Sequence, residues 1–108
     1  MAVFKGTGRL IDARGTPIGE GRAYIHLRQP AEQPQRAQGT LSLDWWNTDD
    51  GVATDGVRLD LDGGPGLNLE VESDKLSECV AGRILRYSTN WPGSADRSGS
   101  AGVGSGQV

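Results

Sequence analysis

The sequence predicts an all-β fold, with about six antiparallel strands arranged as a small barrel or as a two-sheet sandwich. Apolar and polar residues alternate with a period of two in several short segments, which is typical of half-buried strands. Seventeen glycines and five prolines separate these segments with turns. No long segment has helical periodicity, and we expect at most one short helical turn, near residues 73–81.

The strongest strand signal lies in residues 7–28, which predict two strands joined by a tight turn. Gly15 can adopt a positive φ and Pro17 has a restricted φ, so both residues suit that turn. In the return strand, residues 22–28, apolar side chains occupy every second position and therefore share one face. The opposite, solvent-facing side carries Arg22, Tyr24, His26 and Arg28.

Residues 38–46 predict a third strand. In this strand Trp45 is expected on the same core-facing side as Leu41 and Leu43. Because neighbouring residues of a strand point in opposite directions, Trp46 is expected on the outer side, and the two tryptophans cannot both point inward. Thr40, Ser42 and Asp44 would share that outer side and extend the face of the preceding strand.

The remaining strands complete one predicted domain. Residues 57–61 and 67–71 predict a hairpin with a leucine-rich core face, and residues 83–88 predict the last strand. Residues 92–108 are rich in glycine and serine and carry too little apolar surface to offset the entropy of ordering, so we expect a flexible tail. The sequence therefore predicts a single domain over residues 1–91, followed by this tail.

Residues 8–18, Gly-Arg-Leu-Ile-Asp-Ala-Arg-Gly-Thr-Pro-Ile, resemble the opening of carboxypeptidase-regulatory-like domains, which begin G-x-[VL]-x-D-x-x-G-x-P-[IL]. In that family an alternating strand follows, as residues 23–27 do here, so the resemblance covers residues 8–27. The resemblance implies a small β-sandwich that serves as a structural or adhesive appendage and has no catalytic residues.

Composition and charge disfavour several classes of function. The formal net charge is −3, which disfavours general binding to the phosphate backbone of nucleic acids. Cys79 is the single cysteine, which excludes an internal disulfide and a cysteine-based metal cage. The N-terminus lacks an apolar signal region, and no run of about 18 apolar residues occurs. We therefore expect a cytoplasmic protein that does not enter a membrane.

Few residues suit catalysis or metal binding. Cys79 and His26 are the one thiol–imidazole pair, but no third group is identified that would orient them, and lone cysteines are commonly small buried hydrophobes. Asp60 and Asp62 begin a calcium-loop pattern that fails at Gly64. The phosphate-loop, zinc-protease and nucleophile-elbow motifs are missing. We therefore expect no catalytic residues, no metal and no cofactor.

Two hypotheses for function remain. The first, which we favour, is a non-catalytic binding or assembly module that contacts a protein, either another chain or a second copy. It would use the outer face of residues 22–28 or a sheet edge. The second hypothesis is a small-ligand-binding barrel whose pocket is lined by Trp45, Trp46 and Trp91.

Overall fold

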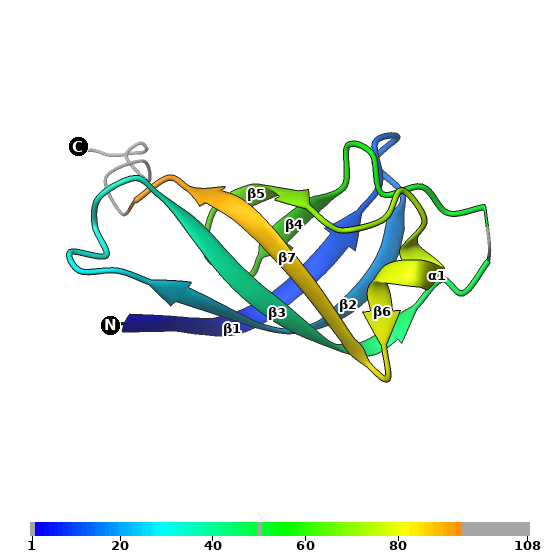
Figure 1. Cartoon of the computed structure of the whole chain (residues 1–108), viewed down its shortest axis with the longest axis horizontal. Coiled ribbons are helices and arrows are strands. Elements are labelled where there is room, and N and C mark those ends of the chain that lie inside the picture. Colours follow the sequence, from blue (N-terminus) through cyan, green and yellow to red (C-terminus); the bar gives the residue numbers. More distant parts are fainter. Residues whose placement is uncertain (1, 50, 94–108) are drawn as a thin grey trace.

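The computed structural model describes residues 2–49 and 51–93, and these residues form a closed antiparallel β-barrel (Figure 1). Within them, six strands close the barrel in the order β3-β2-β1-β4-β5-β7, because β7 pairs back onto β3, and the short β6 adds to β7. The elements are β1 (Ala2–Ile11), β2 (Pro17–Leu27), β3 (Gln35–Trp46), β4 (Arg58–Leu61), β5 (Gly66–Glu70), α1 (Leu76–Cys79), β6 (Val80–Ala81) and β7 (Ile84–Trp91).

The predicted all-β class is confirmed, and the barrel is the alternative that the chain adopts. The helical turn expected near residues 73–81 is α1. Over the described residues, no helix is both long enough and apolar enough to cross a membrane. Of the tail expected over residues 92–108, residues 94–108 lie outside the described part of the chain.

The turn between β1 and β2 forms where the sequence predicts it. The side chain of Asp12 accepts hydrogen bonds from the main-chain N–H groups of Arg14 and Thr16, both at 2.9 Å. Gly15 takes a φ of 88°, which a residue with a Cβ rarely adopts. The two strands then pair along nearly their whole length, so this hairpin holds β2 and its polar face in place.

Leucine side chains fill the interior of the barrel. Leu41 on β3 is fully buried, and it lies opposite Ala23 of β2 on one side and Leu85 of β7 on the other. Thr89 is also fully buried, and its hydroxyl donates a 2.8 Å hydrogen bond to the main-chain oxygen of Asn68. The interior is therefore a packed core, as in other small barrels, and its other fully buried large residues are Leu10, Ile25, Leu43, Leu59, Leu67, Leu76 and Leu85.

β3 contains a bulge at Asp44. Gly21 of β2 lies opposite Leu43, but the preceding residue of β2, Glu20, lies opposite Trp45. Asp44 is therefore an extra residue without a partner on β2. Such an extra residue shifts the in–out alternation of the strand by one position.

The bulge reverses the expected facing of the two tryptophans of β3. Trp45 points outward with 44% of its surface exposed, whereas Trp46 is half-buried and packs against the core. The prediction that Trp45 shares the core-facing side with Leu43 is therefore wrong, because strict alternation does not hold across a bulge.

Gly21 sits where β2 and β3 approach each other beside the bulge. A Cβ at this position would overlap the main-chain oxygen of Ser42 and would lie 2.8 Å from the Cα of Leu43. Both atoms belong to the backbone of β3, so they cannot move aside as a flexible side chain would. A residue without a side chain is thus required for this close approach.

Replacing Gly21 with alanine tests the close approach. We expect Gly21→Ala to lower the free energy of unfolding by about 1–3 kcal/mol or more, because the added Cβ forces β2 and β3 apart. Chemical denaturation measures the loss. Gly51→Ala is the matched control, since a Cβ at Gly51 meets no atom within 4 Å. Equal stability of the two variants would contradict this close packing of β2 against β3.

Candidate functional site

Outward-pointing side chains of β1, β2, β3 and β7 form the candidate site. Most of them are exposed, and they combine positive charge with two aromatic rings. The site lies on the convex outer surface of the barrel, over strands that pair with one another in sequence. We call it the aromatic–basic face, and it consists of Lys5, Arg22, Tyr24, His26, Trp45 and Arg86.

The centre of the aromatic–basic face is a row that crosses four neighbouring strands. Lys5 of β1 lies opposite Tyr24 of β2. Tyr24 lies opposite Thr40 of β3, which in turn lies opposite Arg86 of β7. Residues that face each other across paired strands point to the same side of the sheet, with Cβ atoms about 5 Å apart. The row therefore places a lysine and an arginine on either side of a central tyrosine.

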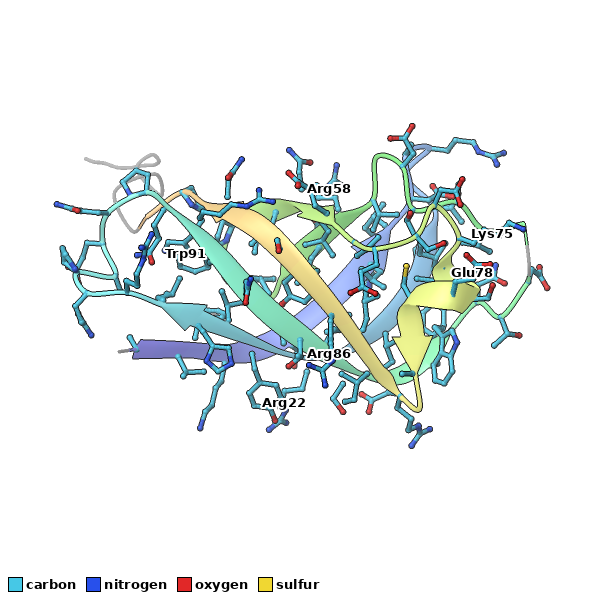
Figure 2. The ribbon with its side chains drawn as sticks, in the orientation of Figure 1. Arg22, Arg58, Lys75, Glu78, Arg86 and Trp91 are labelled. Atoms are coloured by element: carbon cyan, nitrogen blue, oxygen red, sulfur yellow. The ribbon has the colours of Figure 1, made fainter. Side chains whose placement is uncertain are left out.

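The other members of the face occupy the neighbouring rows. His26 and Arg22 flank Tyr24 at alternate positions of β2, so all three point outward. One row beyond Arg22, the bulge places Trp45 opposite Glu20, and the indole N–H donates to the Glu20 carboxylate at 3.4 Å. Figure 2 shows Arg22 and Arg86 projecting from one side of the barrel and Arg58 from the opposite side.

The cations of the aromatic–basic face have no carboxylate partner in the described part of the chain. The ion pairs found there join Arg36 to Glu70 at 2.6 Å and Arg58 to Asp60 at 2.8 Å. Hydrogen bonding to Arg36 holds the pKa of Glu70 below its usual value, and it raises the pKa of Arg36. Within the described residues, Lys5, Arg22 and Arg86 form no such ion pair, so their positive charge is not compensated.

A surface hollow of about 540 Å³ adjoins the face. His26, Thr40 and Arg86 line its side on the barrel wall, and Glu70 and Glu72 line it where the chain leaves β5. The Glu70 carboxylate is already held by its ion pair. The hollow therefore offers a recess beside the guanidinium of Arg86, into which a bound partner could insert a side chain.

The structure brings together three of the site residues expected from β2, namely Arg22, Tyr24 and His26. Arg28 is not part of this group because it lies beyond the end of β2. Its main-chain N–H donates to the side-chain oxygen of Gln35 at 2.7 Å, and its carbonyl accepts from the amide nitrogen of the same side chain at 2.9 Å. Through these two hydrogen bonds, the backbone of Arg28 holds Gln35, the residue at which β3 begins.

The three tryptophans do not line a common pocket. Trp45 and Trp46 are the last two residues of β3, whereas Trp91 lies opposite Gln35, the first residue of β3. Trp91 is 7% exposed, and its ring centroid is 5.5 Å from that of Phe4 at the other end of the barrel. The three tryptophans expected to line one pocket therefore lie at two separate places, Trp45 and Trp46 at one end of the barrel and Trp91 at the other.

Sequence reasoning missed three contributions to the face. Lys5 follows the alternation of β1 and could have been found from it, since Val3, Lys5 and Thr7 are all exposed. Arg86 could not be assigned to a face because Ile84 and Leu85 are adjacent apolar residues. The outward position of Trp45 depends on a bulge that has no signal in the local pattern.

The candidate catalytic pair is not assembled. The Cys79 thiol lies 3.3 Å from the main-chain oxygens of Ser73 and Lys75, either of which can accept its single S–H hydrogen. His26 instead projects from the outer surface of β2. Among the described residues, no group of three or more His, Cys, Asp or Glu side chains could hold a metal ion.

Acrylamide quenching of tryptophan fluorescence tests the facing of the indoles. We expect Trp45→Phe to lower the quenching slope clearly, because Trp45 is 44% exposed. Trp91→Phe is the matched control and should leave the slope unchanged or raise it, because Trp91 is 7% exposed. A fall in the slope for Trp91→Phe alone would contradict the structure.

Comparison with known proteins finds no match: no family model, curated protein or solved structure is significantly similar to the chain. The resemblance of residues 8–27 to carboxypeptidase-regulatory-like domains therefore stays a prediction.

Proposed function

We propose that the chain is a non-catalytic protein-binding module that engages its partner through the aromatic–basic face. The observation that carries this proposal is the placement of Trp45, Arg22 and Tyr24 in successive rows of one outer surface. Tryptophan, tyrosine and arginine are the residues most enriched among the energetic anchors of protein interfaces. An exposed tryptophan beside them supplies apolar area that a partner can cover.

The packing of the barrel supports binding on the outside. Leucine side chains occupy the interior, so a partner has to contact the outer surface or one end. Closure of the barrel also leaves few open strand edges among the described residues, which favours a face over an edge as the contact. The proposal places this module in the cytoplasm.

Selection from a displayed random-peptide library tests this function. We expect the selected peptides to bind the wild-type protein and to lose about tenfold or more of their affinity for Trp45→Ala, because truncating an interface anchor costs 2 kcal/mol or more. Arg58→Ala, on the opposite side of the barrel, should bind them normally. Thermal unfolding checks that both variants remain folded. Selected peptides that bind Trp45→Ala as well as wild type would overturn the proposal.

A second candidate function is binding of a small apolar ligand at the end of the barrel near Trp91. One observation favours it: an open hollow of about 310 Å³ lies there, lined by Phe4, Leu27, Ala31, Pro65 and Trp91. The lining is largely apolar, which suits an apolar ligand. This candidate is the ligand-binding hypothesis with one lining tryptophan, Trp91, instead of the three expected from the sequence.

A variant with Trp91 as its single tryptophan tests the second candidate. In Trp45→Phe/Trp46→Phe, we expect a saturable change of fluorescence with at least one member of a panel of small apolar metabolites, because a ligand in the hollow contacts the indole. Phe4→Ala in the same background should weaken that response, since Phe4 packs against Trp91 and also lines the hollow. A panel without any response would count against ligand binding at this end.

A further inference from the structure

The positive charge of the aromatic–basic face indicates the chemical nature of its partner. Lys5, Arg22 and Arg86 are exposed, and in the described part of the chain each lies farther than 4 Å from any carboxylate oxygen. Elsewhere on the barrel, Arg36 and Arg58 each hold an acidic partner. The face therefore holds three exposed cations without an acidic partner, on a chain whose overall charge is −3. A surface of this kind attracts complementary negative charge.

The spacing of the cations suits an extended chain. Neighbouring strands are about 4.8 Å apart and alternate residues of one strand about 6.7 Å apart, so the three cations lie roughly 8–14 Å from one another at the backbone. Carboxylates at alternate positions of an extended peptide are separated by about 7 Å, and at every fourth position by about 13 Å. The spacing of the cations and that of the carboxylates need not be identical, because the side chains of Arg22, Arg86 and Lys5 are long enough to make up the difference. Arginine also binds carboxylates with paired hydrogen bonds.

We infer that the partner segment is a short, extended acidic peptide that also carries an apolar side chain. Its carboxylates pair with Arg22, Arg86 and Lys5, and its apolar side chain packs on Tyr24 or Trp45. This inference rests on the proposed function and names the partner's chemistry. Glu20 and Asp44 lie beside Trp45 and limit the positive patch on that side, so a short acidic segment fits better than a long polyanion.

Single-stranded nucleic acid is the weaker fit for the same face. Such binders track the backbone with a positively charged groove and stack successive bases on aromatic side chains. Here the two aromatic residues, Tyr24 and Trp45, are separated by the row of Arg22, and the net charge of −3 opposes a long phosphate chain. The observations therefore favour a peptide.

Fluorescence anisotropy with synthetic probes tests the inference. The first probe is a short labelled peptide with glutamate at alternate positions and one central phenylalanine, and the second has glutamine in place of each glutamate. The third is a single-stranded oligothymidine of equal charge. We expect saturable binding of the first peptide that weakens with added salt, and binding of the glutamine peptide that is weaker by about tenfold or more.

Variants locate the binding. Arg22→Gln/Arg86→Gln should lower the affinity for the acidic peptide by about tenfold or more, since two charge-assisted contacts are lost. Arg14→Gln/Arg58→Gln is the matched control: it removes the same charge from exposed positions off the face and should bind normally. Tighter binding of oligothymidine, equal binding of the glutamine peptide, or equal weakening in both double variants would each overturn the inference.

The remaining outcomes separate this inference from the proposed function. Light scattering of the wild type, run with the titrations, detects self-association. An oligomer that dissociates in Arg22→Gln/Arg86→Gln would overturn the acidic-peptide inference in favour of a second copy. If library peptides bind the face through Trp45 but carry no acidic residues, the inference fails and the proposed function stands. If no selected peptide depends on the face, the proposed function fails as well.

Discussion

The pairing of β3 with β7 is the constraint on which the rest of the structure depends. β3 is twelve residues long, and it pairs with β2 along one edge and with β7 along the other. This second pairing closes the sheet, so the inner faces of all six barrel strands meet around Leu41. It also satisfies main-chain hydrogen-bonding groups that an open sheet would expose at its edges. Closure thus produces both the core and the continuous outer surface.

The same closure decides where the molecule can interact. A small barrel with a filled interior has no lumen to offer, so contacts are limited to its ends and its outer wall. On that wall, residues from both halves of the chain become neighbours: Lys5 and Arg86 are far apart in sequence but share one row through Tyr24 and Thr40. The aromatic–basic face is therefore a composite surface, to which β2 contributes three side chains and β1, β3 and β7 contribute one each.

The bulge at Asp44 determines the chemical character of this surface. With regular pairing, the indole of Trp45 would enter the core and the indole of Trp46 would point outward in its place. The extra residue turns Trp45 outward beside Glu20 and leaves Trp46 packed against the core. Gly21 permits this arrangement because any side chain there would meet the backbone of β3. One glycine and one unpaired residue thus decide which tryptophan a partner can reach.

The sequence by itself determined the features that depend on neighbours along the chain. The alternation of residues 22–28 assigned Ile25 to the core and Tyr24 to the surface, and Asp12 and Gly15 marked the turn, as the structure confirms. Only the tertiary structure decided the pairing of β3 with β7, the neighbours of Arg86 and the facing of Trp45. In–out alternation arises from the local pleat of one strand. The bulge and the closure of the barrel arise from contacts between distant segments, and the local pattern of one strand does not encode these contacts.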